Sequence, residues 1–167
     1  VDGQIKTGRD VVIGAMLGAD EFGFGTTPLV AMGCLMMRKC QKNTCPAGIA
    51  TQDPALRRQF VGRPEHVENY FHFVAREVRE IMAQLGVAKF DDLIGHVEYL
   101  RKRSGLDGLK ASKLSLEKIL YKLPNPKGFP LLSTEPQDHE LEKAFDLRYA
   151  AELSEALKAK RPMRVQT

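Results

Sequence analysis

The stretch VDGQIKTGRDVVIGAMLGADEFGFGTTPLV, residues 1–30, decides the predicted fold, because its pattern changes from helical to strand-like and back to helical. Residues 7–17 carry apolar side chains at helical spacing, with Thr7 suited to the N-cap and Gly18 to the end of a helix. We therefore predict a short amphipathic helix at residues 7–17.

A strand-like segment follows this helix. Residues 21–25 are short, aromatic and bounded by turn-forming residues, which favours a buried strand. Residues 26–28 join two threonines to a proline, which predicts a cap and another helix from about Leu29. The order loop, helix, strand, loop, helix is typical of a parallel barrel or a doubly wound sheet, so we predict an α/β fold.

The loops of this pattern suggest a phosphate pocket. In such barrels the loops after the last two strands commonly form one at the carboxyl ends of the strands. Gly3 and Gly25 lie where the backbone would approach a ligand, Lys6 offers a positive charge and Thr26 a hydroxyl donor. Glycine turns are also common without any ligand, so a purely structural role stays open.

Composition places the chain among globular proteins. Of its 167 residues 43% are hydrophobic and 28% charged, and no apolar run approaches the roughly 18 to 20 residues of a membrane helix. We expect a soluble, cytoplasmic protein that does not bind membranes. The net charge is +4, but basic and acidic residues alternate, which argues against a nucleic-acid-binding surface.

Three cysteines lie close together in the sequence. Cys34, Cys40 and Cys45 have the spacing Cys-x5-Cys-x4-Cys, followed at once by Pro46. An odd number of crowded cysteines argues against a secreted disulfide framework and for shared metal ligation. Because a four-iron cubane normally takes one thiolate per iron, three thiolates suit a cluster that lacks one corner, the 3Fe–4S form.

Two other interpretations of the cysteines stay open. Structural zinc would need a fourth ligand, for which His66 and His72 are the nearest candidates, and three unconnected reduced thiols are also possible. Arg38, Lys39 and Lys42 flank the cysteines. They would offset the charge of a cluster, or simply keep a loop soluble.

The rest of the chain has one strong helical pattern. Residues 64–85 carry apolar side chains in steps of three and four, with Pro64 suited to the first turn and Gly86 to the end. His72 lies off the apolar stripe and His66 lies in the first turn, so we expect both to be exposed structural residues.

Weaker patterns follow this long helix. Residues 90–100 predict one or two short helices, 104–136 an irregular connector and 140–160 a helix that Pro162 ends. Residues 163–166 suggest the opening strand of a further domain.

Several runs of residues resemble glutamate synthases. DGQIKTGRDVV at residues 2–12 and LGADEFGFGT at 17–26 are similar to the end of that family's synthase barrel. AMGCLMMRKCQKNTCPAGIATQ at residues 31–52 is similar to its cluster loop. The likeness returns at residues 64–67, 90–95 and 134–142, so it covers nearly the whole chain.

The resemblance implies a specific architecture, the C-terminal part of a (β/α)8 FMN-binding barrel, followed by a cluster loop and a mostly helical connector. The expected domains are the barrel end at residues 1–33, the iron–sulfur loop at 34–52, a helical segment packed on the barrel at 53–103, and a connector toward a C-terminal β-helix at 104–167.

The resemblance also implies the cofactor contacts. A first FMN-phosphate loop would hold Asp2, Gly3, Gln4 and Lys6, and a second Gly25 and Thr26; the ligands of the 3Fe–4S cluster would be Cys34, Cys40 and Cys45. Gln4 departs from the glycine that flavin barrels often have there. No catalytic residue is expected within the chain.

In this family, ammonia released from glutamine reacts with 2-oxoglutarate, and reduced FMN completes L-glutamate. Electrons come from ferredoxin or an NADPH-oxidising small subunit. Since the chain has no initiator methionine, we expect an internal fragment. It would lack the amidotransferase nucleophile and most barrel strands, so we expect it to be inactive alone. A truncated barrel would expose strand edges and apolar surface, so we also expect poor stability. The alternative is a stand-alone iron–sulfur or zinc-binding module, which would not need the barrel-like first 30 residues.

Overall fold

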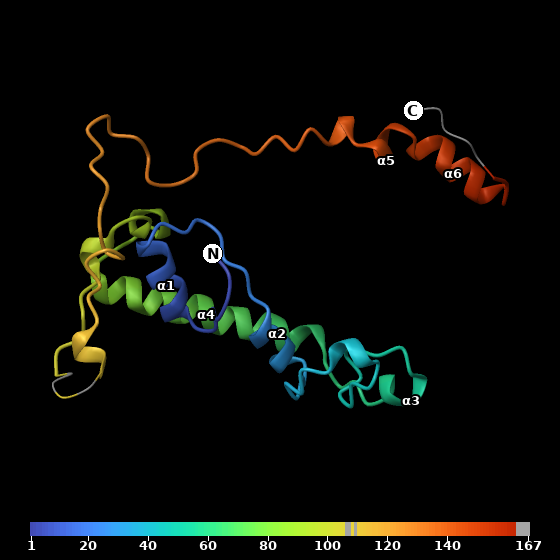
Figure 1. Cartoon of the computed structure of the whole chain (residues 1–167), viewed down its shortest axis with the longest axis horizontal. Coiled ribbons are helices and arrows are strands. Elements are labelled where there is room, and N and C mark those ends of the chain that lie inside the picture. The colour runs from blue at the N-terminus through green and yellow to red at the C-terminus, as the bar shows by residue number, and fades with distance from the viewer. Residues whose placement is uncertain (106–107, 109, 163–167) are drawn as a thin grey trace. The chain divides into compact units, whose positions relative to one another are not determined.

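The computed structural model describes residues 1–105, 108 and 110–162, which form two compact units, Val1–Ser133 and Thr134–Thr167. The α-helices of the first unit are α1 (Gly8–Met16), α2 (Thr26–Ala31), α3 (Pro54–Arg57) and α4 (Pro64–Leu85) (Figure 1). Its short 3₁₀ helices are Cys40–Lys42, Phe90–Leu93, Val97–Tyr99 and Lys110–Lys113. The second unit contains the 3₁₀ helix Leu141–Lys143, α5 (Phe145–Arg148) and α6 (Ala150–Lys158).

The long helix α4 has the bounds that the sequence predicts. Pro64 occupies its first turn, where a missing N–H leaves no hydrogen bond unmade. Gly86 ends it with a φ of 73°, a left-handed conformation that glycine adopts without steric cost. His66 and His72 are exposed on this helix, as predicted.

Helix α1 begins at a capping box. The Thr7 hydroxyl accepts a hydrogen bond from the Asp10 amide (3.2 Å), and the Asp10 carboxylate accepts one from the Thr7 amide (3.0 Å). Burial alone would raise the pKa of Asp10, but hydrogen bonds from Lys6 and Thr7 and the charge of Lys6 outweigh it and lower the pKa. The predicted helix and its cap are confirmed.

The core forms where α1 crosses α4. Gly8 permits a close approach, because a Cβ there would lie 2.7 Å from both Val74 O and Val78 N. The Gly8 amide donates to Glu77 Oε2 across the crossing (2.7 Å). The buried apolar side chains of this core are Val11, Val12, Ala15, Met16, Val74, Val78, Met82, Leu93 and Ile94.

The predicted α/β fold, with the end of a (β/α)8 barrel, is wrong. Within residues 1–105, 108 and 110–162 every regular element is a helix, and no strand, sheet or barrel forms. Residues 21–25 are irregular, and their aromatic side chains pack on helical neighbours instead of a sheet. The ring centroids of Phe22 and Phe90 lie 6.0 Å apart, and those of Phe24 and Phe71 lie 5.1 Å apart, both edge-to-face.

Other predicted elements differ in their limits. The helix expected from about Leu29 begins at Thr26, with Gly25 rather than a threonine at its N-cap. The helix expected at 140–160 is divided into a 3₁₀ helix, α5 and α6, while 90–100 forms two short 3₁₀ helices as predicted. The strand suggested at 163–166 lies outside the described residues.

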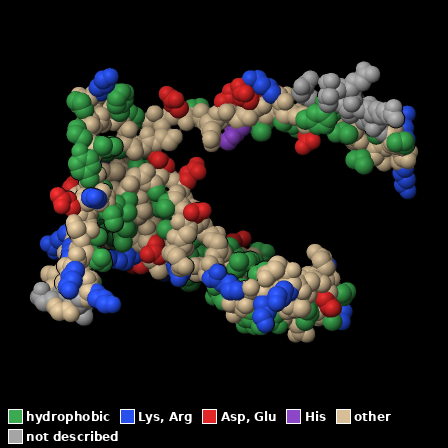
Figure 2. All heavy atoms as spheres, in the orientation of Figure 1, with side chains coloured by type: hydrophobic (Ala, Val, Ile, Leu, Met, Phe, Trp, Pro, Cys, Tyr) green, Lys and Arg blue, Asp and Glu red, His purple; other side chains and the backbone are tan. Residues whose placement is uncertain are grey.

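The first unit leaves much apolar surface exposed. Hydrophobic side chains remain visible among the charged ones in Figure 2. Leu35, directly after Cys34, is 65% exposed, and Val61 is 73% exposed. Among the helices that the structure describes, none has the length and apolar character needed to cross a membrane.

Candidate functional site

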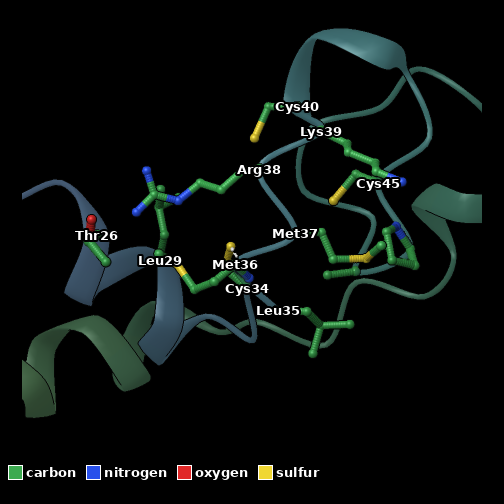
Figure 3. A pocket seen from close by; sticks show the side chains of 12 residues that line it. Thr26, Leu29, Cys34, Leu35, Met36, Met37, Arg38, Lys39, Cys40 and Cys45 are labelled. Atoms are coloured by element: carbon green, nitrogen blue, oxygen red, sulfur yellow. Dashed lines mark hydrogen bonds between the residues drawn. The ribbon is translucent and has the colours of Figure 1, made fainter.

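The three cysteines line one pocket of about 230 Å³ (Figure 3). All three thiols are free of disulfides, with Cys34 and Cys45 partly buried and Cys40 exposed. The pocket walls also include side chains from the residues between them, and Thr26 from the start of α2. The structure thus brings together the three residues that the sequence predicts as ligands.

Two local elements place the three cysteines. Cys34 follows α2 and a left-handed Gly33, and its amide donates to Leu29 O (2.9 Å). Cys40 begins the 3₁₀ helix Cys40–Lys42, and Asn43 caps the end of that helix. Cys45 lies two residues after Asn43. Two short turns are therefore enough to bend the chain around the pocket.

The loop between the cysteines has an unusual backbone. Six described non-glycine residues have a positive φ, and three of them, Met36, Arg38 and Asn43, lie between Cys34 and Cys45. A left-handed conformation costs about 1–2 kcal/mol for an ordinary L-residue. Such conformations collect at functional sites, where the surrounding structure enforces them.

Backbone amides influence two of the sulfur atoms. The Met36 amide donates to Cys34 Sγ at 3.4 Å. The amide of Ala50, followed by those of Ile49, Ala47 and Gly48, lowers the pKa of the Cys45 thiol against the opposing effect of burial. A lower pKa favours the thiolate, which is the form of cysteine that binds metals.

The thiols surround a pocket rather than a single point. Among the described residues, no group of three His, Cys, Asp or Glu side chains converges closely enough to hold one metal ion. A structural zinc would need four ligands within about 2.3 Å of the metal. His66 does not line the cysteine pocket, and its Nδ1 accepts from the Arg63 amide (3.3 Å) at the start of α4.

The predicted first FMN loop lies at the exposed amino terminus. Asp2, Gly3, Gln4 and Lys6 are all exposed, and none of them lines the cysteine pocket. Gln4 has a φ of 61°, next to Gly3 at 80°, so Gln4 adopts a conformation that a glycine would adopt at lower cost. The departure noted in the sequence is therefore accommodated in the backbone.

The backbone of Lys6 is already committed to contacts within the protein. Its amide donates to Asp10 Oδ2 (3.0 Å), and its carbonyl accepts from the Tyr70 hydroxyl (2.8 Å). Only its exposed ammonium group is left for an anionic ligand.

The second predicted FMN loop lies close in sequence to contacts with the amino terminus and with the cysteine pocket. Just before this loop, Val1 N donates to Glu21 O (2.6 Å), and Gly23 N donates to Val1 O (2.8 Å). Thr26 lines the cysteine pocket, while Gly25 immediately precedes α2. The residues predicted for two cofactors thus lie on one continuous segment.

Sequence reasoning missed Asn43 and Thr51. Asn43 Oδ1 accepts hydrogen bonds from the Gln52 amide (2.6 Å) and the Thr51 hydroxyl (3.1 Å). The available signal was an asparagine in a turn between two cysteines, since asparagine tolerates left-handed backbone well.

The comparisons with known proteins match this region. Residues 1–88 match a family described as the conserved region in glutamate synthase. The chain is 48% identical over 147 residues to the NADPH glutamate synthase large chain of Bacillus subtilis, covering 87% of this chain and 9% of that protein. It is 46% identical over 126 residues to ferredoxin-dependent glutamate synthase 2 of Synechocystis sp., covering 75% of this chain and 8% of that protein.

An NADH-type relative matches equally well. The NADH glutamate synthase of Schizosaccharomyces pombe is 48% identical over 146 residues, which cover 87% of this chain and 7% of that protein. The chain therefore spans less than a tenth of the length of these relatives. Because the family match covers more than half of its residues, the chain belongs to the glutamate synthase family.

Proposed function

We propose that this chain serves a glutamate synthase reaction, in which ammonia derived from glutamine is transferred reductively to 2-oxoglutarate to give L-glutamate. Its own part is to hold a 3Fe–4S cluster on Cys34, Cys40 and Cys45. The observation that carries the proposal is the single pocket lined by all three free thiols. Family membership supports it, because NADPH, NADH and ferredoxin relatives all carry the synthase name.

The donor set fits such a cluster. Soft thiolates favour iron–sulfur chemistry, and in a cluster each thiolate binds a different iron, so the sulfurs need not converge on one point. The amide that donates to Cys34 Sγ and the amides that lower the pKa of Cys45 would both stabilise sulfurs that carry negative charge as ligands. The pocket of about 230 Å³ has room for several heavy atoms.

Each type of residue around the pocket has a separate task. When bound, the cluster supplies one-electron transfer to the flavin. The thiolates hold it, and the side chains of Arg38 and Lys39, which line the same pocket (Figure 3), offset its negative charge. Met36, Met37 and Pro46 provide apolar wall that limits the access of water.

FMN contacts form the second part of the proposal. Asp2, Gly3, Gln4 and Lys6 would form the first FMN-phosphate loop, and Gly25 with Thr26 would form the second. A Cβ at Gly3 or Gly25 would meet no atom within 4 Å, so a ligand can approach the backbone there. The Lys6 ammonium supplies a positive charge for the phosphate.

The chain is proposed to act within a larger cytoplasmic enzyme. Ferredoxin or an NADPH-oxidising small subunit would supply electrons. Residues 34–52 would serve as the cluster loop, 53–103 as its helical support and 104–167 as a connector toward a further domain.

Iron and sulfide analysis with electron paramagnetic resonance tests the cluster. The complete polypeptide that carries this chain is prepared anaerobically as wild type, as Cys40→Ser and as Thr44→Ala, a control that changes an exposed neighbour of Cys45. We expect about three irons per chain and an oxidised-state iron–sulfur signal in the wild type and the control, both lost in Cys40→Ser. Zinc without iron or sulfide, or an unchanged signal in Cys40→Ser, contradicts the proposal.

A further inference from the structure

We propose that Asn43 is a positioning residue, which closes the loop that carries Cys45 and thereby fixes the backbone amides near the Cys45 sulfur. This inference rests on the proposed function, because it concerns how the same cluster is held. Asn43 itself does not line the cysteine pocket, so it acts through the backbone of its loop.

The backbone of Asn43 makes the turn between two of the ligands. It follows the 3₁₀ helix Cys40–Lys42 with a φ of 57° and a ψ of 22°, the left-handed region. Asparagine is among the non-glycine residues best suited to this conformation. The turn reverses the chain between Cys40 and Cys45.

The side chain of Asn43 closes a loop with residues on the far side of Cys45. Its Oδ1 accepts from the Gln52 amide (2.6 Å), and the Thr51 hydroxyl is shared between Asn43 O (2.9 Å) and Asn43 Oδ1 (3.1 Å). These contacts join residues eight and nine positions apart. These hydrogen bonds join the two ends of the loop 43–52, and we call them the clasp.

The clasp is fixed to the next helix. The Asp53 amide donates to the Thr51 hydroxyl oxygen (3.1 Å), and Asp53 Oδ1 accepts from the Ala55 amide (2.7 Å) as the N-cap of α3. Motion of the clasp would therefore require α3 to move or lose its cap.

The loop enclosed by the clasp contains the amides that surround Cys45 Sγ. They belong to residues 47–50, and Ala50 lies directly before Thr51. Gly48 anchors the middle of the loop, because a Cβ there would lie 2.7 Å from Leu56 O. With both points held, the amides keep a fixed orientation toward the sulfur.

This arrangement predicts an effect on redox potential. Amide hydrogen bonds to a ligating sulfur stabilise the more negatively charged, reduced cluster. Opening the clasp would weaken them, so the midpoint potential would fall and iron would be released more readily. A residue needed only for folding would not shift the potential of correctly folded, cluster-loaded protein.

The test compares two loop clasps of the same chemical type. Asn43→Gly removes Oδ1 but keeps a left-handed turn without strain. Asn125→Gly is the matched control, since Asn125 also bridges a turn, with Oδ1 accepting from the Phe129 amide (2.9 Å) and Nδ2 donating to Phe129 O (2.7 Å). Thr51→Val removes the second half of the clasp, and Thr51→Ser retains the hydroxyl.

The readouts are a redox titration followed by electron paramagnetic resonance and the rate of iron loss to a chelator, both on the complete cluster-loaded protein. In Asn43→Gly and Thr51→Val we expect the equilibrium constant for reduction of the cluster to fall about tenfold. This lowers the midpoint potential by about 59 mV for one electron. Asn125→Gly and Thr51→Ser should match the wild type. If Asn43→Gly fails to fold, Thr51→Val decides the question.

The outcomes separate the two proposals. Wild-type potential and iron retention in both clasp variants would overturn the positioning role while the cluster assignment stands. Equal shifts in Asn125→Gly would show a general loss of stability and overturn it as well. A wild-type protein without iron and sulfide would overturn the cluster and the role of Asn43 together.

Discussion

Gly8→Ala tests the close crossing of α1 and α4. The new Cβ would lie 2.7 Å from Val74 O and Val78 N, about 0.7 Å short of the 3.4 Å at which ordinary contacts begin. Because these are backbone atoms of a long helix, the two helices must separate. Overpacking of this kind costs about 1–3 kcal/mol, whereas alanine gains about 0.5–1 kcal/mol over glycine within a helix. The net expected loss of unfolding free energy is about 1–2 kcal/mol.

Urea unfolding followed by circular dichroism measures this loss. The midpoint should fall by about 0.5–1 M at an unchanged m-value. Gly25→Ala is the control, because a Cβ there meets no atom within 4 Å and the φ of −110° suits alanine. Gly14→Ala should lie between the two, since its nearest contact at 2.8 Å is the mobile edge of the Phe22 ring. A Gly8→Ala protein as stable as the wild type would refute the assigned crossing geometry.

Two further predictions concern polar contacts around the same core. The pKa of Glu98 is lowered from its usual value of 4.5 to about 2 by its own amide, by His96 and by Lys122. The Glu98 carboxylate therefore stabilises the fold above pH 4.5. This stabilisation is lost as the pH falls from 4.5 to about 2. At neutral pH the unfolding free energies of wild type and Glu98→Gln should differ by less than about 1 kcal/mol, because the Glu98 side chain is half exposed. The two free energies should converge at pH 2. A difference that does not change with pH would contradict this prediction. Tyr70→Phe removes the 2.8 Å hydrogen bond to Lys6 O but keeps the ring, so unfolding free energy measured in urea should fall by about 1 kcal/mol, and no change would mean that water replaces the contact.

Local signals predicted the helices well. The periodicity of residues 64–85, Pro64 at the start and Gly86 at the end are all local features, and they define α4 correctly. Thr7 likewise defines the start of α1 through a contact only three residues away. Helical hydrogen bonds join near neighbours, so the sequence pattern contains most of the required information.

The strand prediction failed because a strand depends on distant partners. Residues 21–25 are short, aromatic and bounded by turn-forming residues, but this pattern indicates only that the aromatic side chains are buried, not what covers them. In the structure their partners are aromatic residues on α4 and the 3₁₀ helix Phe90–Leu93.

The sequence indicated which cysteines line the pocket, but not which residues support their loop. Cysteine spacing alone predicts that Cys34, Cys40 and Cys45 meet, and they line one pocket. Asn43 and Thr51 carry no comparable signature, because their role arises from hydrogen bonds that exist only after the loop has closed. Such contacts depend on the folded path of the chain.

The left-handed residues Met36 and Arg38 have a consequence for how sequences in this region can vary over evolutionary time. Their φ values of 57° and 55° disfavour valine, isoleucine and threonine on steric grounds alone. A restricted choice of amino acids at these two positions would therefore arise even if neither side chain touched a cofactor. An unchanged amino acid at either position would therefore reflect the shape of the backbone. An exchange of Arg38 for another basic residue would instead indicate that its positive charge matters.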